Sequence, residues 1–367
     1  MGPRSTSRRH VLKTGAAVAS VGLVGSLAGC SDALDGNGDS DDTETPGGSS
    51  SDIPEGANVV MGADFQEIIN DEEIRDAVNT ALAAESANDD RIPSSVDGVF
   101  DRIEEEGDVD LRELEEVVLF GESEDDEETD YVGFLAYTNW NAGAIREAIE
   151  EMDDEDIEKS EHNGVTVYVN DDADEDTERI AVFEDGTIVF GSGGAVHDVI
   201  DVRAGDADPI SGEIKEAWEA TGGGYARIAV VPDSEDLPEG TEAADRTADL
   251  VTYVYGSLYA DGSMRGFRIN METESEDDAR EVRGAINSQR LIARDEAESE
   301  GNQELAEFLD ETAVETDGTT VTITNEVPVD EITPFVERFV VGFVRGFRSG
   351  ATGGTDVLSL DAGSAVT

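Results

Sequence analysis

This chain of 367 residues has few of the side chains on which enzymes and nucleic-acid-binding proteins depend. It has one cysteine, Cys30, and three histidines. Only Lys13, Lys159 and Lys215 are lysines, so arginine supplies 24 − 3 = 21 of the basic residues. A single cysteine excludes a disulfide framework and cannot supply a thiolate cluster for a metal. No basic stripe lies outside the amino-terminus, which excludes the phosphate contacts of nucleic-acid binding, so we expect no nucleic-acid partner.

Catalytic signatures are missing as well. The chain contains no GxSxG, HExxH, GxxxxGK or GxGxxG motif. It also has no Asn-x-Ser/Thr acceptor for N-linked sugar. We therefore assign no catalytic, cofactor-binding or metal-binding residue, expect no cofactor, and favour a non-enzymatic protein. A hydrolase that uses an unrecognised carboxylate pair is the less favoured alternative.

Acidic residues are abundant. The 88 Asp and Glu against 24 Lys and Arg give a formal charge of 24 − 88 = −64. This composition resembles that of proteins from salt-loving archaea. At about 1 M salt the screening length falls to ~3 Å, so neighbouring carboxylates repel one another little. We interpret the charge first as an adaptation of the surface to salt, and only second as a sign that the surface binds a partner.

The first thirty residues have the pattern of an export signal. Arg8 and Arg9 form a twin-arginine pair, and residues 15–28 are small and weakly apolar. This run of 14 is too short to span a bilayer, which needs about 20 residues. It ends in Leu27-Ala28-Gly29-Cys30, the pattern of a lipoprotein cleavage site. An uncleaved anchor or a chance arginine pair is the alternative interpretation.

Together these residues resemble the signal peptides of haloarchaeal lipoproteins of unknown function that are exported by the twin-arginine route. The resemblance implies cleavage before Cys30 and a two-chain lipid on its sulfur. Two lipid chains give stable attachment, whereas one chain gives only marginal attachment. We therefore expect a protein anchored to the outer face of the cell membrane, with the membrane as its partner through the lipid on Cys30.

The fold class that we expect is α+β, built as a duplicated unit of antiparallel hairpins with helices packed on one face of the sheet. Each half follows the order of two strands, a helix, hairpin strands and a helix. The halves could form one continuous sheet or two separate domains. The predicted segments are the signal peptide (1–29), the lipidated cysteine with a disordered acidic tether (30–56), half 1 (57–221), half 2 (222–348) and a disordered tail (349–367).

Four Asx-Gly pairs mark the predicted hairpin turns, because a two-residue turn requires positive φ at its centre. These pairs are Asn163-Gly164, Asp185-Gly186, Asp261-Gly262 and Asp317-Gly318. Apolar spacing predicts helices over residues 71–84, 95–105, 142–152, 195–202, 275–297 and 303–309. A further helix is predicted from Thr333, with Phe335, Phe339, Phe343 and Phe347 on one side. Its apolar side is expected to cover the sheet; a membrane surface or a partner helix are alternatives.

A few residues are weighed as ligand contacts. Trp140, where a strand turns into a helix, is a speculative ligand contact, although such a residue more often fixes the helix to the sheet. His162 and His197 are surface histidines unless a cleft surrounds them. The glycine-rich turn at residues 190–194 could bind an anion, but such turns are common. Asp172, Asp174 and Asp176 imitate a calcium loop without its glycine or its final glutamate, so we interpret them as surface acids.

The sequence therefore predicts a surface lipoprotein that binds an unknown ligand or a surface protein. A carrier that encloses a lipid or another apolar ligand between sheet and helices is the alternative.

Overall fold

The computed structural model describes residues 50–87, 92–107, 109–122, 131–151, 157–170, 178–232 and 249–329. The described residues fall into two compact units. The first unit contains those up to Gln66 and from Glu113 to Val327, and the second contains those from Glu67 to Arg112 together with Pro328 and Val329. The predicted signal, most of the tether, the terminal helix and the tail lie outside the described residues. The predicted domain boundaries stay predictions.

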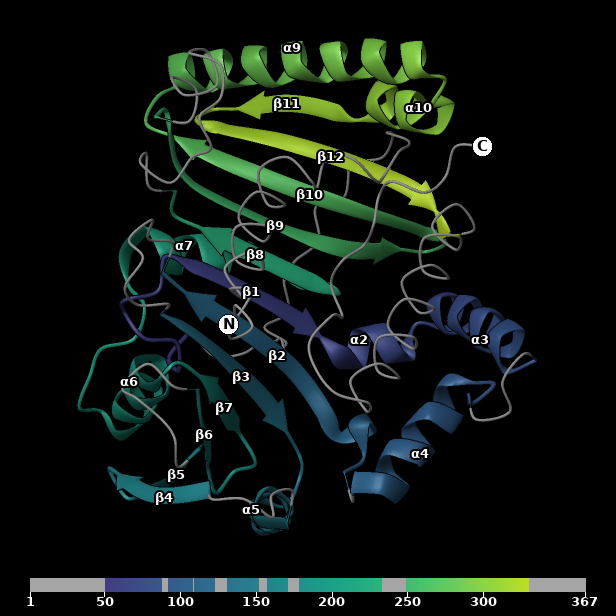
Figure 1. The fold of residues 1–367 in the computed structure, drawn as a ribbon. Coiled ribbons are helices and arrows are strands. Elements are labelled where there is room, and N and C mark those ends of the chain that lie inside the picture. The colour runs from purple at the N-terminus through teal and green to yellow at the C-terminus, as the bar shows by residue number, and fades with distance from the viewer. Residues whose placement is uncertain are drawn as a thin grey trace, which may run out of the picture. The chain divides into compact units, whose positions relative to one another are not determined.

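The first unit is built on one continuous sheet of twelve strands (Figure 1). Every recorded strand pair is antiparallel, and the order is β11-β12-β10-β9-β8-β1-β2-β3-β7-β6-β5-β4. The strands are β1 (Val59–Asp64), β2 (Leu114–Gly121), β3 (Val132–Thr138), β4 (Ile157–His162), β5 (Val165–Asn170), β6 (Arg179–Val182), β7 (Ile188–Gly191), β8 (Ala226–Val230), β9 (Val251–Asp261), β10 (Met264–Thr273), β11 (Ala313–Asp317) and β12 (Thr320–Pro328).

The two halves of the chain repeat one plan within this sheet. Each half begins with an antiparallel meander, β1-β2-β3 in the first and β8-β9-β10 in the second. A later hairpin strand then returns to the third strand of its meander, as β7 does to β3 and β12 does to β10. The halves join where β1 pairs with β8, with Met61 opposite Ile228. The two halves of the α+β fold therefore form one continuous sheet, the first of the two arrangements that the sequence leaves open.

The hairpin turns follow from local sequence. All four predicted Asx-Gly pairs mark connections between paired strands, but only Asn163-Gly164 forms both residues of a two-residue turn. Asp261 and Asp317 are the last residues of β9 and β11, so the turns there begin at Gly262 and Gly318. Asp185-Gly186 lies in the longer connection of residues 183–187, which corrects the prediction of a two-residue turn. At the β4–β5 turn, Asn163 has φ 45° and Gly164 has φ 79°. Positive φ at both central positions is the requirement of the hairpin turn whose twist matches that of the strands, and Asn and Gly tolerate it best.

Helices pack on both faces of the sheet, which corrects the expectation of one covered face. Val167 on β5 packs in the cluster of α6, whereas the adjacent Tyr168 packs in the cluster of α5. Successive strand residues point to opposite faces, so both faces are buried there. The helices of this unit are α5 (Ala142–Glu151), α6 (Gly193–Ala204), α7 (Gly212–Ala220), α9 (Glu276–Glu300) and α10 (Gln303–Glu311). Of these, only α7 is not predicted from the sequence.

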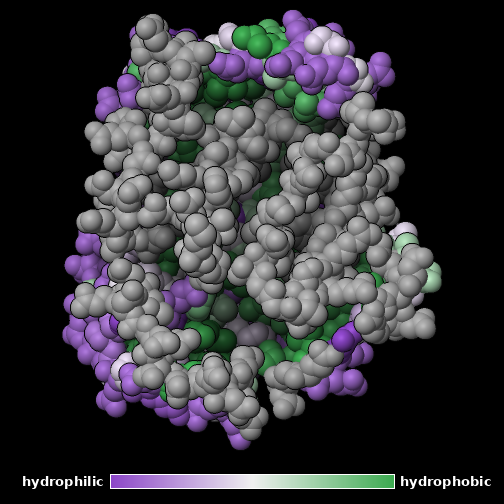
Figure 2. Space-filling view, viewed as in Figure 1, coloured by the Kyte–Doolittle hydropathy of each residue, from purple (hydrophilic) through white to green (hydrophobic). Residues whose placement is uncertain are grey.

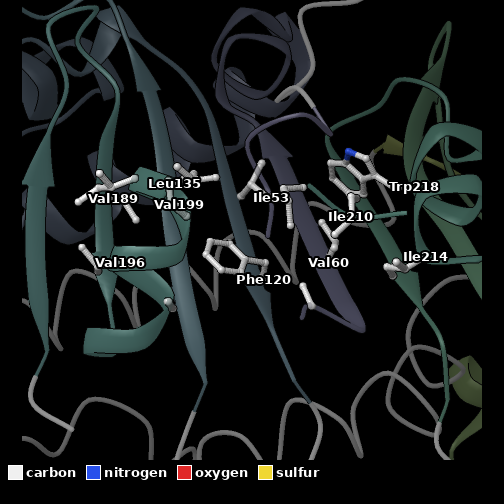
Figure 3. Close-up of a cluster of buried hydrophobic side chains, with 14 of the residues drawn as sticks. Ile53, Val60, Phe120, Leu135, Val189, Val196, Val199, Ile210, Ile214 and Trp218 are labelled. Carbon is white, nitrogen blue, oxygen red and sulfur yellow. The ribbon is translucent and has the colours of Figure 1, made fainter. Parts of the chain in front are cut away.

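The largest core lies between α6, α7 and the middle of the sheet (Figure 3). Phe120 and Val60 are fully buried on neighbouring strands, and Trp218 of α7 is 2% exposed. Ile53, which precedes the first strand, is also fully buried in this cluster. The folded body therefore begins within the range that the sequence assigns to the tether.

The opposite face of the central strands is apolar but lies outside the three buried clusters over much of its extent. We call its apolar stretch the open face; it comprises fourteen positions on β8, β1, β2, β3 and β7, and excludes the exposed Glu115 at the start of β2. These positions are Val59, Met61, Ala63, Val117, Leu119, Gly121, Val132, Phe134, Ala136, Ile188, Phe190, Ala226, Ile228 and Val230. In Figure 2 hydrophilic residues dominate the outer margin of the view, whereas hydrophobic residues are visible in its middle.

The second unit is helical. It contains α3 (Glu72–Ser86), α4 (Val96–Gly107), most of the short α2 (Phe65–Asn70) and the start of the 3-10 turn Leu111–Glu113. Both longer helices are predicted from the sequence, but α2 and the turn are not.

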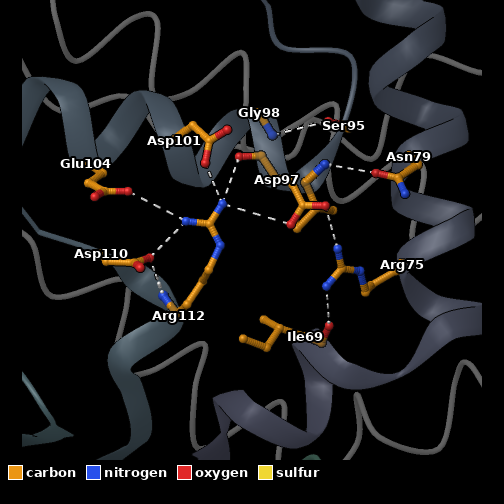
Figure 4. Close-up of polar contacts among 11 residues, drawn as sticks. Ile69, Arg75, Asn79, Ser95, Asp97, Gly98, Asp101, Glu104, Asp110 and Arg112 are labelled. Carbon is orange, nitrogen blue, oxygen red and sulfur yellow. Dashed lines mark hydrogen bonds and ion pairs between the residues drawn. The ribbon is translucent and has the colours of Figure 1, made fainter.

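An acidic cluster around Arg112 and Arg75 holds the second unit together (Figure 4). Arg112 contacts Asp101 at 2.6 Å and Asp110 at 3.1 Å. Arg75 contacts Asp97 at 2.7 Å, which links α3 to α4. Arg112 thus meets several carboxylates, whereas Arg75 pairs with Asp97 and also donates to the carbonyl of Ile69 at 3.2 Å.

Candidate functional site

Helix α6 is the platform of the candidate site. Ser192 caps its amino-terminus, because its hydroxyl oxygen accepts a hydrogen bond from the N–H of Ala195 at 3.5 Å, and Gly205 ends the helix with φ 80°. Val196, Val199 and Ile200 are buried against the sheet. His197 and Asp201, four positions apart, therefore share another side of the helix.

The β4–β5 hairpin brings His162 to this helix. The distance from His162 Nε2 to Asp201 Oδ1 is 2.5 Å. Asn163, in the turn, donates from Nδ2 to Asp201 Oδ1 at 2.7 Å and to Asp206 Oδ2 at 3.0 Å. Three polar contacts therefore tie the hairpin tip to the end of α6.

His197 stacks on His162. Their ring centroids lie 4.3 Å apart and the ring planes differ by 7°. Arg179 on β6 points Nη1 at His197 Nε2 at a distance of 2.9 Å. Because a guanidinium can only donate, the imidazole must accept this bond with an unprotonated nitrogen. We call His162, His197, Arg179 and Asp201 the histidine cluster.

The surroundings of His197 oppose its protonation. Burial lowers the pKa of His197 most, and the charge of Arg179 and the neighbouring His162 lower it further. Asp201 and Asp198 act in the opposite direction. Asp198 also accepts a hydrogen bond from the hydroxyl of Tyr131, at 2.9 Å to Oδ2. Burial raises the pKa of Tyr131 most, and the negative charge of Asp198 raises it further.

The histidine cluster is placed to respond to protonation. Its histidines contact Asp201 and Arg179, which carry opposite charges. Within the described ranges, no three side chains of His, Cys, Asp or Glu are placed to hold a metal ion. The cluster is therefore a protonation-sensitive joint between the hairpin and α6.

The structure places some of the other predicted contacts. Trp140 is half-buried and packs against the cluster of Ala142, Ile145 and Tyr168, so it fixes α5 to the sheet. In the glycine-rich turn, the side chain of Ser192 already occupies the helix cap. Ligand contact by Trp140 stays a prediction.

Other predicted residues lie outside the described ranges. These are Cys30, Arg8 and Arg9, the acidic run at Asp172, Asp174 and Asp176, and the phenylalanines of the terminal helix.

Sequence reasoning misses the partners of the two histidines. The i, i+4 spacing of His197 and Asp201 is visible in the sequence, but nothing local pairs His162 with α6. It also misses a buried ion pair: Arg227 on β8 contacts Glu116 on β2, and Glu116 is 3% exposed. The guanidinium of Arg227 lies 4.2 Å from the ring centroid of Trp218.

None of the helices in the described part of the chain combines the length and the apolar character that crossing a membrane requires. No protein-family model and no curated protein matches the sequence. Among solved structures, the chain is similar to crystal form I of TP0453, with 10% identity and a TM-score of 0.41 over 78% of this chain and 96% of that one. Crystal form III gives 8% identity and a TM-score of 0.41 over 78% and 97% of the two chains. A similarity of this size supports no functional conclusion.

Proposed function

We propose that this protein is an exported, lipid-anchored surface protein whose folded body serves as a non-enzymatic binding or interaction module. The observation that carries the proposal is the combination of Arg8-Arg9 with a short apolar run and the Leu27-Ala28-Gly29-Cys30 sequence. The lipid on Cys30 attaches the protein to the outer face of the membrane, as in the haloarchaeal lipoproteins that the signal resembles.

The folded body supports this proposal through its composition. The body has no cysteine and therefore no disulfide, so the continuous sheet and its apolar clusters must stabilise it. The charge of −64 suits a protein exposed to concentrated salt, where its carboxylates are screened.

The proposal is tested by Cys30→Ser in a salt-loving archaeal host. We expect the variant to leave the membrane fraction, and intact-mass analysis of the wild type to show a lipid on the first residue of the mature chain. Ser31→Ala is the matched control and should stay in the membrane fraction. Unmodified Cys30 in mature wild-type protein, or tight membrane association of the serine variant, would refute the anchor.

The export route is tested separately. Replacing Arg8 and Arg9 together by lysine keeps the positive charge but removes the pair that the resemblance identifies as the export signal. We expect this variant to accumulate inside the cell with its leader intact. Normal surface delivery would exclude the twin-arginine route, whatever the state of Cys30.

A further inference from the structure

A continuous row of apolar side chains crosses the middle of the open face. Met61 on β1 lies opposite Ile228 on one side and Leu119 on the other. The row continues from Leu119 to Phe134 on β3 and from there to Phe190 on β7. It therefore crosses five neighbouring strands, β8, β1, β2, β3 and β7.

Helices cover the same face beyond both ends of this row. On the β7 side, Phe190 lies opposite Ile180, which packs in the cluster of α5. On the β8 side, Ile228 lies opposite Gly256, and Gly256 opposite Ile269 in the cluster of α9 and α10. Neighbouring strands lie about 4.8 Å apart, so the stretch between the covered ends is roughly 20 Å wide.

The middle of this stretch is accessible. Met61 is 40% exposed and Phe134 is 39% exposed, whereas Val60 and Leu135, their neighbours on the opposite face, are fully buried. The rings of Phe134 and Phe190 lie 6.1 Å apart. Contiguous apolar patches at a protein surface, unlike single exposed apolar residues, mark sites where another molecule binds.

The chemistry of the open face identifies the class of its occupant. None of its fourteen positions carries a charge or a side chain that can form a hydrogen bond, although 31% of the chain is charged. The nearest acid on the same side of β2 is Glu115, which lies at the start of the strand, two residues before Val117, and accepts a hydrogen bond from Asn139. The core of a protein–protein interface is about 65% apolar, and such interfaces make roughly one hydrogen bond per 100–200 Å². A face without polar side chains instead suits a hydrocarbon chain, which forms no hydrogen bonds.

We propose that the open face binds the hydrocarbon chain of a lipid. The inference rests on the proposed function, because a body tethered to a membrane stays close to a supply of lipids. The helices α5 and α9–α10 border the site, and the flexible thioether side chain of Met61 lets the surface adapt to a mobile chain.

The test uses the full chain carrying Cys30→Ser, so that no covalent lipid competes for the site. The probe is N-phenyl-1-naphthylamine, a neutral dye that fluoresces in apolar surroundings, titrated in concentrated salt and displaced with hexadecanol. We expect saturable fluorescence that hexadecanol removes. Met61→Gln combined with Phe134→Gln should weaken probe binding about tenfold, which corresponds to a loss of about 1.4 kcal/mol of binding free energy.

The matched control is Leu291→Gln combined with Ile292→Gln on α9, two apolar side chains that are 43% and 61% exposed but lie away from the row. It should bind the probe as the parent does, and thermal unfolding should show that both variants are folded. Three results would each overturn the proposal. The first is no hexadecanol-sensitive fluorescence, and the second is an equal loss of binding in the control. The third is probe binding only after residues 332–367 have been removed, because those residues would then be the occupant of the face in the full chain. Because the assay omits the anchor, it succeeds or fails independently of lipidation at Cys30.

Discussion

The indole ring of Trp218 occupies the space that a side chain at position 62 would need: a Cβ on Gly62 would lie 2.7 Å from Trp218 Cη2. Trp218 is 2% exposed and belongs to the largest apolar cluster. The close approach of α7 to β1 therefore depends on a glycine at this position.

Gly62→Ala should destabilise the first unit by about 1–3 kcal/mol, because the indole ring must move within a packed core. Gly284→Ala in α9 is the matched control: a Cβ there meets nothing within 4 Å. The control should be stabilised by about 0.5–1 kcal/mol, because alanine favours a helix. Denaturant unfolding in concentrated salt measures both changes, and equal stability of the two variants would contradict the close-packing argument.

Removing one member of the buried ion pair should be more costly. Burial raises the pKa of Glu116, and the charge of Arg227 opposes the rise. Arg227→Met leaves this carboxylate without its cation and should cost about 3–5 kcal/mol near neutral pH. Adding Glu116→Leu should recover most of the loss, since both charges are then gone. A double-mutant cycle on unfolding free energies measures the coupling, and additive effects would show that the pair is not coupled.

The histidine cluster should make stability depend on pH. The pKa of His197 in the folded protein lies below its ordinary value of 6.5, so the unfolded chain binds the proton more readily. The stability that neutral His197 contributes to the folded state is present above pH 6.5 and is lost as pH falls through the lowered pKa. Unfolding followed across this range should show stability decreasing toward acid, and His197→Gln should remove part of that slope.

An NMR titration separates the two histidines. His197 should titrate below 6.5 in the parent protein, and Arg179→Gln should raise its pKa, because that change removes the nearest cation. Lys159→Gln, on the neighbouring β4, is a control of equal charge change. A His197 pKa at or above 6.5 in the parent would refute the geometry of the cluster.

Stability should fall when salt is removed. The screening length lengthens from ~3 Å at 1 M to ~30 Å at 0.01 M, so carboxylates across the surface begin to repel one another. We expect the thermal midpoint to decrease on dialysis and to be restored by potassium chloride more than by sucrose, which is excluded from protein surfaces but screens no charge. Equal recovery in sucrose would show that screening is not the cause.

Local structure is largely predictable from this sequence. Asx-Gly pairs place the turns because their glycines, and Asn163 in the first pair, adopt positive φ. The capping residue Ser275 marks the start of α9. The short α7 escapes prediction because it buries only Ile214, Ala217 and Trp218. Its stability comes from contact with β8 and β9, which local pattern does not reveal.

Long-range features are less predictable. The stack of His162 on His197 depends on how the β4–β5 hairpin meets α6, and each residue alone has the pattern of a surface histidine. The covering of both sheet faces is missed because strands such as β4 carry charged residues, and the sequence alone does not show that β5 is buried on both sides. The prediction of a lipid on Cys30 differs from these, because it depends only on the residues that precede Cys30 in the sequence.

Pairing β1 with β8 makes β4 and β11 the two border strands of the sheet formed by the described residues. On β4, Glu158, Lys159 and Glu161 are exposed, and on β11 Glu315 and Asp317 are. Charged side chains on a border strand discourage the backbone of a neighbouring molecule from hydrogen-bonding alongside it. Crowded copies of the protein should therefore remain separate and not polymerise edge to edge.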